Sequence, residues 1–410
     1  MPRESQCRFC GAPLVHSFAD LGMSPLANRY LTADQVNAME PFFPLHALVC
    51  ERCFLVQLEE FETPDAIFSD YAYFSSFSTS WLEHCRNYAE TAIGRFGLGA
   101  GSQVVELASN DGYLLQYFKA QGVPVLGVEP AANVARVAEE ERGIRTVVSF
   151  FGRETAGTLA GELRADLLIG NNVLAHVPDL NDFVAGMKTL LADNGVITME
   201  FPHLMRLVED RQFDTIYHEH FSYFSFLTVK QVFAAHGLEL FDVDELPTHG
   251  GSLRIYACHE GAQEPRGSVA ELERREEDAG YRNLETYTEF SELVKSEKRE
   301  ILSSLIALKG DGASIVGYGA PAKGNTLLNY CGIGTDFIDY TVDRSPHKQG
   351  HFLPGTHIPI RAPEEIDRTR PDVVFILPWN LREEIMDQLS HISDWGGRFL
   401  VRSPALELHA

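Results

Sequence analysis

A stretch near the middle of the chain, Asp214–Phe226, places two histidines, a glutamate and a tyrosine among further aromatic residues. Aromatic side chains exclude water, and burial moves the pKa of a titratable group among them toward the working pH. An imidazole beside a carboxylate, as in His220 and Glu219, is the combination that proton abstraction next to a carbonyl requires. Taken alone, the pattern favours an aromatic core segment with polar residues between the rings. The rest of the chain favours catalysis by Tyr217, Glu219 and His220.

Four of the seven cysteines form two CxxC pairs near the N-terminus, Cys7 with Cys10 and Cys50 with Cys53, and 39 residues separate the pairs. Four thiolates in this pattern predict a tetrahedral, structural zinc site. Two unrelated redox or free-thiol pairs are the alternative. The other three cysteines lie in apolar segments and are expected to be ordinary buried thiols: Cys85, Cys258 and Cys331.

The composition describes a soluble globular protein of two or three domains, with 410 residues, 45% hydrophobic and 22% charged. The net charge of −24 argues against binding to nucleic acid or an anionic membrane, and any anionic substrate must be held by local donors. We expect a cytoplasmic protein, because the chain shows neither a membrane-spanning apolar run nor a signal peptide.

The central part of the chain alternates between strands and helices. Strands are expected at 104–108, 124–128, 145–148, 166–170 and 195–200, and helices at 82–96, from 113 onward and at 180–191. This alternation predicts a parallel sheet with its ligand at the carboxyl ends of the strands.

Acidic residues stand at two of these strand ends. Glu129 could accept two hydrogen bonds from a ribose diol, and Glu106 could accept from an ammonium group. A ligand that has both groups is S-adenosylmethionine (SAM). The first turn reads ELASNDG and lacks the GxGxxG of a dinucleotide site, so NAD fits less well. Solvated strand ends are the alternative.

A second α/β unit is expected from Ala313, with strands at 313–317, 337–342, 373–377 and 398–401. Its glycine-rich loop GYGAPAKGN enters a helix and carries Lys323, which predicts a phosphate cradle rather than a plain turn. Between the two units we expect a helix at 227–236, strands at 239–246 and 253–258, and a tight loop at His249. Ser268–Lys309 is expected to form a charged connecting helix or helix pair. The run Tyr71–Trp81 could close over a small polar ligand or pack between domains.

A series of motifs along nearly the whole chain is similar, in kind and in order, to the motifs of a known family. They are the paired CxxC, YFSSFSTSW, VVELASNDGYL, NNVLAHVPD, FDTIYHEHFSYFS, HGGSLRIY, GYGAPAKGNTLLNY and PGTHIPI. The chain resembles the SAM-dependent C-methyltransferases that act on nucleotide-linked deoxysugars. The resemblance implies an α/β protein with a zinc-binding module at 1–66 and a Rossmann-like SAM methyltransferase domain at 67–262 that contains the segment 214–226. A helical connector at 263–309 and a C-terminal Rossmann-like domain at 310–410, which anchors the nucleotide sugar, complete the plan.

The resemblance also implies roles for individual residues. The structural zinc would be held by Cys7, Cys10, Cys50 and Cys53. Catalysis would rest on His220, Glu219, Tyr217 and His176. The SAM site would be lined by Tyr71, Ser76, Glu106, Asn110, Asp111, Glu129, Asn171 and Asn172. The substrate would be bound by His249, Lys323 and Asn325. One departure is Ala108-Ser109, where many methyltransferases have a glycine.

The implied reaction adds a methyl group to carbon 3 of a 4-keto-deoxysugar carried on a nucleotide, in most members dTDP. A neutral His220 suits the base near pH 7, Tyr217 or His176 can donate to the enolate oxygen, and Glu219 either orients its neighbour or competes as base. No nucleic-acid or membrane partner is expected, and the enzyme is expected to be a monomer or weak homo-oligomer. The alternatives are a GDP-sugar substrate, an NAD-dependent nucleotide-sugar oxidoreductase or epimerase, and a non-catalytic adaptor.

Overall fold

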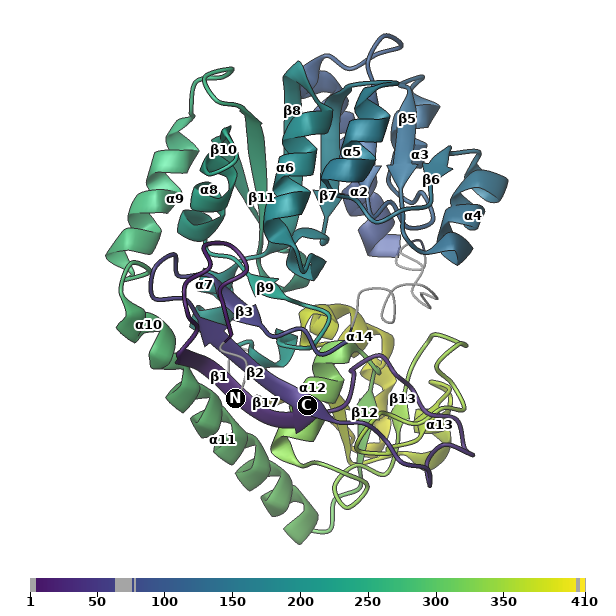
Figure 1. Cartoon of the computed structure of the whole chain (residues 1–410). Helices are drawn as coiled ribbons and strands as arrows, with labels where there is room; N and C mark the ends of the chain where they lie inside the picture. The colour runs from purple at the N-terminus through teal and green to yellow at the C-terminus, as the bar shows by residue number, and fades with distance from the viewer. Residues whose placement is uncertain (1–4, 63–75, 77–78, 403–405, 410) are drawn as a thin grey trace.

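The structure is a computed structural model that describes residues 5–62, 76, 79–402 and 406–409 of the chain. Three β-sheets organise these residues, and the two larger ones form separate lobes (Figure 1). Within the described ranges, no helix combines the length and the apolar character that spanning a bilayer requires.

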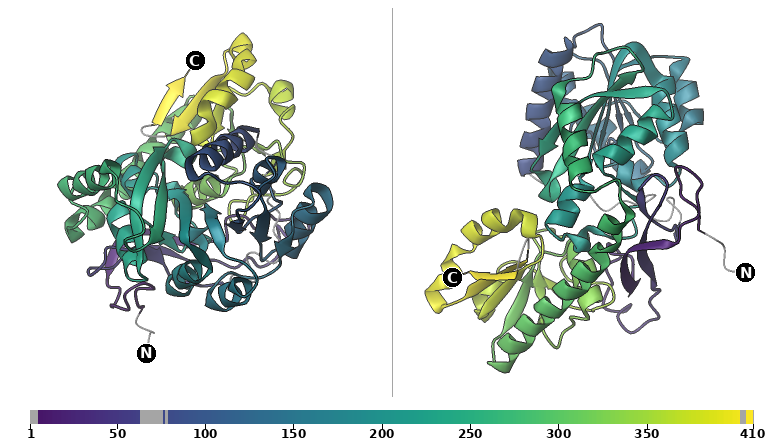
Figure 2. Two further views of the ribbon diagram at one scale, coloured as in Figure 1. Left: turned by 90° about the horizontal axis from the view of Figure 1, so that it is seen from above. Right: turned by 90° about the vertical axis from the view of Figure 1, so that its left-hand side faces the viewer.

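A seven-stranded sheet with helices on both faces forms the upper lobe in Figure 1 and in the right-hand view of Figure 2. Its order is β10-β11-β8-β7-β4-β5-β6, in which β8 to β6 are parallel and β11 is antiparallel to both neighbours. The strands are β4 (Val104–Leu107), β5 (Val125–Val128), β6 (Thr146–Val147), β7 (Ala165–Asn171), β8 (Leu191–Pro202), β10 (Leu238–Leu246) and β11 (Ser252–His259).

Three of the helices of this lobe begin or end at recognisable signals. The helices are α2 (Thr79–Phe96), α3 (Leu115–Ala120), α4 (Ala132–Arg142), α5 (Arg153–Ala160), α6 (Leu180–Leu190), α7 (Leu204–Glu209) and α8 (Phe226–Ala234). The side chains of Asp179 and Ser225 accept backbone hydrogen bonds at the starts of α6 and α8. Gly143, with φ of 62°, ends α4 in the left-handed region.

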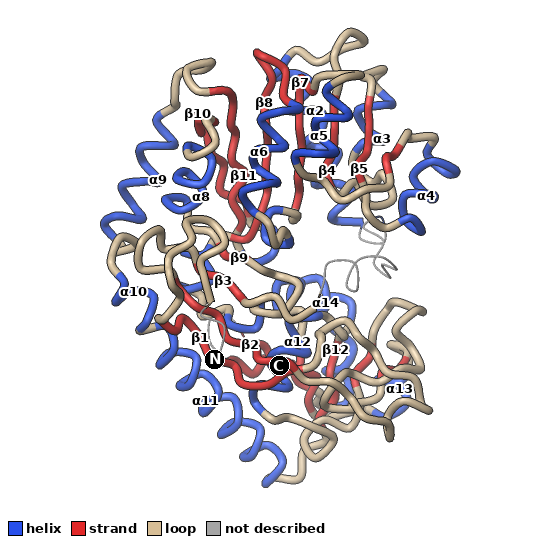
Figure 3. The backbone as a smooth tube through the Cα atoms, viewed as in Figure 1, coloured by secondary structure: helices blue, strands red, loops and turns tan. Residues whose placement is uncertain are grey.

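A small antiparallel sheet, visible as β1, β2, β3 and β9 in Figure 3, forms the N-terminal module. It consists of β1 (His16–Ser24), β2 (Phe43–Val49), β3 (Val56–Leu58) and β9 (Ser222–Tyr223). The last of these strands comes from the segment that the sequence analysis placed at the centre of the chemistry. Because β9 pairs with β3, the N-terminal module and this segment are held together by backbone hydrogen bonds.

Three helices connect the upper lobe to the C-terminal domain: α9 (Gly267–Asp278), α10 (Leu284–Thr288) and α11 (Phe290–Gly310). The charged connecting helix or helix pair expected at 268–309 is instead a run of three helices. Gly280, with φ of 86°, follows α9 and turns the chain. Both α10 and α11 pack on β1.

The C-terminal domain is a six-stranded sheet of order β14-β13-β12-β15-β16-β17. All pairs are parallel except β16 with β17. The elements are β12 (Ile315–Tyr318), α12 (Ala322–Cys331), β13 (Thr341–Val342), β14 (Ile360–Arg361), α13 (Glu365–Thr369), β15 (Val373–Ile376), α14 (Arg382–Gln388), β16 (Arg398–Arg402) and β17 (Leu406–His409).

Several predicted boundaries differ from the structure, and two of the differences have a clear local cause. The strand expected at 337–342 covers only Thr341 and Val342, because the amides of Phe337 and Ile338 both bond the carbonyl of Gly334 in a turn. The helix expected from residue 113 begins at Leu115, because the turn that ends at Gly112 occupies the preceding positions.

Candidate active site

The four thiols of the two CxxC pairs meet in the N-terminal module. Their sulfur atoms all lie within 4.8 Å of one another, and each of the four cysteines is free of a disulfide. A tight turn shapes each pair, with backbone hydrogen bonds from Gly11 to Cys7 and from Phe54 to Cys50. Four thiols at this separation fit a closed tetrahedral zinc site, in which no position remains open for catalysis.

Glu106, near the carboxyl end of β4, is a buried acidic residue whose carboxylate lacks a hydrogen-bond partner among the described residues. Its side chain is fully buried, and neither oxygen has a hydrogen-bond partner within normal distance among the described residues. Burial raises its pKa well above the ordinary value, although the Tyr113 hydroxyl opposes the shift. A cationic ligand group, such as the ammonium of SAM, would supply the missing partner.

Glu129 follows β5 and lies against the same turn. One of its oxygens accepts from the Asn110 amide and the other from the Ala131 amide, each at 2.9 Å. Burial raises the pKa of Glu129, and these two backbone bonds oppose the shift. A carboxylate has about four acceptor sites, so two remain for a ribose diol.

The turn between β4 and α3 adopts left-handed backbone without glycine at two positions. Ala108 has φ of 53° and Asn110 has φ of 48°. The departure at Ala108 that the sequence analysis noted is therefore a strained position, since a methyl group disfavours this region. The turn follows β4 directly, so the Ser109–Asp111 backbone lies at the edge of the sheet.

Ser76 and Asp111 meet at this edge, as predicted residues of one site would. The Ser76 hydroxyl donates to Asp111 Oδ2 at 2.5 Å, and Arg142 Nη2 lies 3.5 Å from the same oxygen. Asp111 Oδ1 has no partner among the described residues. Tyr71, predicted for the same site, lies outside the described residues.

Tyr217 and His220 form a hydrogen-bonded pair in the predicted catalytic segment. His220 Nδ1 lies 3.2 Å from the Thr215 carbonyl, and His220 Nε2 lies 2.7 Å from the Tyr217 hydroxyl. A carbonyl only accepts, so Nδ1 carries the hydrogen and Nε2 is a bare acceptor for the Tyr217 hydroxyl. The backbone thus fixes the tautomer in which Nε2 can take a proton.

His176 packs against this pair from the turn that follows β7. Its ring lies edge-on to that of His220, with the centroids 4.7 Å apart. Burial lowers the pKa of His176 to about 4, although a hydrogen bond to the backbone of Glu219 opposes the shift. Burial and the nearby His176 lower the pKa of His220 well below its ordinary value. Both imidazoles are therefore neutral near pH 7.

Glu219 is buried beside them, and burial raises its pKa to about 7. A hydrogen bond of 2.7 Å from Asn28 Nδ2 to Glu219 Oε1 opposes the shift. Asn28 lies between β1 and β2 in the N-terminal module, and the sequence analysis did not single it out. No local motif identifies it, because the two partners are 191 positions apart.

Asn172 and His249 are brought together, whereas Asn171 stands beside them unpaired. Asn172 Nδ2 lies 3.0 Å from His249 Nε2, and both residues have a left-handed backbone. Asn171 is buried, and neither polar atom of its side chain has a partner among the described residues.

Glu200, at the end of β8, organises a network that the sequence analysis missed. It accepts from Thr248 at 2.9 Å, from His84 at 2.9 Å and from Arg254 at 2.5 Å. Burial alone would raise its pKa, but His84 and Arg254 outweigh burial and lower the pKa to about 2. The network ties the loop before His249 to helix α2. An acid at a strand end, as at Glu106, was the available signal.

Lys323 reaches the same region from the first turn of α12. Its ammonium donates to Asn380 Oδ1 at 2.8 Å and lies 4.5 Å from the centre of the Trp379 ring. Burial lowers its pKa to about 8, and its charge in turn lowers the pKa of both His220 and His249. Lys323 therefore faces the histidine cluster.

Asn325 has a different environment from Lys323. It is buried, and its amide donates to the Ala27 carbonyl at 2.5 Å. It joins α12 to the N-terminal module, and its Oδ1 alone remains without a partner among the described residues. Its predicted role in substrate binding remains a prediction.

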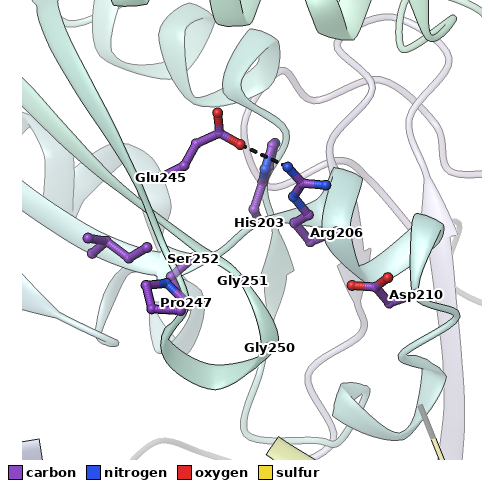
Figure 4. A pocket seen from close by; sticks show the side chains of 9 residues that line it. His203, Arg206, Asp210, Glu245, Pro247, Gly250, Gly251 and Ser252 are labelled. Carbon is purple, nitrogen blue, oxygen red and sulfur yellow. Dashed lines mark hydrogen bonds and ion pairs between the residues drawn. The ribbon is translucent and has the colours of Figure 1, made fainter. Parts of the chain in front are cut away.

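A cavity of about 330 Å³ beside the glycine loop is separate from this cluster (Figure 4). It is lined by His203, Arg206, Asp210, Glu245, Leu246, Pro247, Gly250, Gly251 and Ser252. An ion pair of 3.2 Å between Arg206 and Glu245 crosses it. None of the predicted site residues lines the cavity.

Three protein families match successive parts of the chain, and one curated relative matches nearly its whole length. The matched families are described as a putative zinc binding domain (residues 7–68), a methyltransferase domain (81–243) and a C-methyltransferase C-terminal domain (247–404). Over 404 residues the chain is 38% identical to the C-methyltransferase NovU of Streptomyces niveus, which covers 97% of this chain and 95% of that protein.

Many solved structures match part of the chain, and two of them illustrate the similarity. The magnesium protoporphyrin IX methyltransferase ChlM of Synechocystis, with bound SAM, is 12% identical over 44% of this chain and 79% of that one, with a TM-score of 0.34. The CcbJ methyltransferase of Streptomyces caelestis is 15% identical over 43% of this chain and 90% of that one, with a TM-score of 0.35. At this level of similarity, neither bears on the activity.

The sheet, its buried acids and the family matches define a SAM-dependent methyltransferase with a zinc-binding module. More narrowly, the chain belongs to the C-methyltransferase family. The predicted family, fold class and cofactors are thereby confirmed, and the NAD-dependent and adaptor alternatives are set aside. The predicted domain boundaries and the roles of individual residues remain predictions.

Proposed function

We propose that the enzyme transfers a methyl group to carbon 3 of a 4-keto-deoxysugar carried on dTDP. The observation that carries this proposal is the hydrogen-bonded Tyr217–His220 pair, in which the Thr215 carbonyl fixes the tautomer of His220. Lys323 faces this pair and is suited to the diphosphate of the carrier, which the chain's net charge of −24 would otherwise repel. A GDP-linked sugar is the second candidate carrier.

His220 Nε2 takes the proton from the carbon beside the ketone in this mechanism. The C–H bond breaks, an N–H bond forms, and the electron pair moves to the ketone oxygen as an enolate. Tyr217 releases Nε2 when the substrate enters, and its hydroxyl then donates to the enolate oxygen. SAM, held by Glu106 and Glu129, would supply the electrophilic methyl group: as carbon 3 bonds to it, the ketone re-forms, the sulfur–methyl bond breaks, and S-adenosylhomocysteine leaves as a neutral thioether. The imidazolium finally returns its proton to water.

Glu219 is the competing base, because its pKa of about 7 suits proton transfer at neutral pH. We assign it the supporting role: above pH 7 it is ionised and stabilises the imidazolium that forms on the neighbouring His220. His176 is neutral and orients the cluster from the opposite side.

The test is mass spectrometry of SAM incubated with a panel of dTDP- and GDP-linked 4-keto sugars. We expect a gain of one methyl group on a dTDP-linked 4-keto-deoxysugar, with the label at carbon 3 by NMR. A methyl group on oxygen, or no transfer to any sugar of the panel, would contradict the proposal. We further propose that the enzyme acts in the cytoplasm as a monomer or weak homo-oligomer.

A further inference from the structure

Asn28 reaches from the N-terminal module into the catalytic cluster. Its amide donates to Glu219 Oε1 at 2.7 Å, and among the described residues it is the hydrogen-bond partner of that carboxylate. Glu219 is 7% exposed, so water contributes little to its solvation. A single side chain of another module therefore replaces the water that an exposed carboxylate would have.

The loop that carries Asn28 is anchored on both sides by the C-terminal domain. The Tyr30 hydroxyl donates to the Ala320 carbonyl at 2.6 Å and lies 3.3 Å from Asn28 Oδ1. The Ala27 carbonyl accepts from Asn325, and the Leu31 amide donates to the Phe352 carbonyl at 3.0 Å. Residues on either side of Asn28 are thus fixed, and its amide has little freedom to leave Glu219.

We propose that the N-terminal zinc-binding module completes the active site through Asn28, a positioning residue that fixes the Glu219 carboxylate and stabilises its ionised form. This inference rests on the proposed function, in which Glu219 supports the imidazolium of His220. It also gives the zinc module a role in the reaction, because the module presents Asn28 to the cluster.

Among the groups around Glu219, Asn28 is the one that lowers the pKa of the Glu219 carboxyl. The titratable groups that face the cluster are Tyr30 from the N-terminal module, His176 from the turn after β7, Tyr217, His218 and His220 on the same segment, and His249 and Lys323 opposite His220. None of them shifts the pKa of Glu219, which burial raises and Asn28 lowers. Loss of the Asn28 amide leaves burial unopposed, so the pKa must rise.

The first experiment measures the ionisation of Glu219 in the ligand-free protein by infrared difference spectroscopy. The band of the protonated carboxyl is assigned by its absence in Glu219→Gln. In Asn28→Leu we expect the midpoint of that band to rise by about one to two pH units, the scale of one hydrogen bond to a charged group. In Asn28→Asp, which keeps the size of the side chain, a second carboxylate should raise it at least as far.

The second experiment measures kcat against pH with SAM and the dTDP-4-keto-deoxysugar that the panel identifies. The acid limb should move to higher pH in the order wild type, Asn28→Leu, Asn28→Asp. In the Glu219→Gln background, Asn28→Leu should have no further effect on kcat, because the two residues act through one interaction.

Glu40→Gln is the matched control for docking of the module. Glu40 accepts from the Gly355 amide and from His357, both at 2.9 Å, on the same stretch between β1 and β2 but away from Glu219. We expect it to leave the acid limb where it is. An unchanged Glu219 titration in both Asn28 variants would overturn the inference while leaving the proposed function intact. Absence of methyl transfer by the wild type would refute the proposed function, and the infrared titration would still test the Asn28 contact.

Discussion

At the carboxyl edge of the methyltransferase sheet and of the C-terminal sheet, an acidic side chain holds a loop in the same way, by accepting two backbone hydrogen bonds. In the methyltransferase sheet, Glu129 accepts backbone hydrogen bonds from the turn after the first strand and from the residue two positions ahead. In the C-terminal sheet, Asp343 does the same with the amides of Ala320 and Ser345, each at 2.8 Å. An acid after the second strand of each unit thus fixes the loop that would face a ligand.

The charges beside these two acids are opposite. Glu129 lies near the buried acids Glu106 and Asp111: the charge of Asp111 raises the pKa of both Glu106 and Glu129, and the charge of Glu129 raises the pKa of Glu106. Asp343 instead has Lys348 at 3.7 Å, and Lys323 lies in the first turn of α12, directly after the loop that Asp343 holds. In the proposed function this difference separates two ligands: an acidic edge would suit the cationic SAM, and a basic edge would suit the anionic nucleotide sugar proposed above.

The largest expected effect comes from the cluster between the two edges. His220→Asn should lower kcat by about a hundredfold or more, the contribution of a positioned general base. Glu219→Gln should lower kcat less, because in our account it supports the base. Steady-state kinetics of methyl transfer at saturating SAM and sugar distinguish the two. The reverse order of effects would make Glu219 the base.

Removal of the Glu129 carboxylate should weaken ligand binding only at the edge of the methyltransferase sheet. Glu129→Ala should weaken SAM binding by about 1.5–3 kcal/mol, roughly ten- to a hundredfold, because a hydrogen bond to a charged group is lost. Isothermal calorimetry with SAM measures this, with Asp343→Ala as the matched control in the other sheet. Equal losses of SAM affinity in Glu129→Ala and Asp343→Ala would contradict the assignment of SAM to the methyltransferase sheet alone.

Removal of the Lys323 ammonium should weaken ligand binding only at the edge of the C-terminal sheet. Lys323→Ala should raise the KM for the nucleotide sugar about tenfold, the scale of one charge-assisted hydrogen bond, and leave the Kd for SAM unchanged. Lys309→Ala, which removes a lysine at the end of α11, is the control. A loss of SAM affinity with an unaltered KM for the sugar would show that this loop serves the cofactor.

The smallest effect on SAM is expected from the zinc module. Metal analysis should find about one zinc per chain. Cys50→Ser should lower the thermal midpoint and solubility, whereas the SAM affinity of the folded fraction should change by less than about twofold, since the two sites share no residue. Well-folded protein without metal would contradict the structural role of the cluster.

Local patterns were sufficient to predict most of the fold. Val104–Leu107 is a short strand whose penultimate residue is the acid Glu106, and Glu129 directly follows the next strand, so the sequence alone predicts both acids at one edge of the sheet. The cysteine spacing predicted the metal cluster, because thiolate geometry tolerates a long intervening loop. These features depend on neighbours in sequence or on a strong chemical pattern.

Contacts between distant segments could not be predicted in this way. Strand β9 is only two residues long, and it forms because β3 offers a free edge 165 or more positions earlier in the chain. Trp379 and Arg402 bond the two oxygens of Asp214 at 2.7 and 2.6 Å, yet each stands in an unremarkable apolar context. Asn28 is the clearest case, since only the packing of the module against the C-terminal domain brings it to Glu219.

The most direct test of the account is solvent exchange at carbon 3 without methyl transfer. Wild-type enzyme, S-adenosylhomocysteine and the dTDP-4-keto-deoxysugar are incubated in heavy water, and deuterium is located by NMR. We predict deuterium at carbon 3 in the wild type and a loss of exchange by about a hundredfold or more in His220→Asn. Methyl transfer by the wild type without any exchange at carbon 3 in this assay, or equal exchange in His220→Asn, would contradict the account.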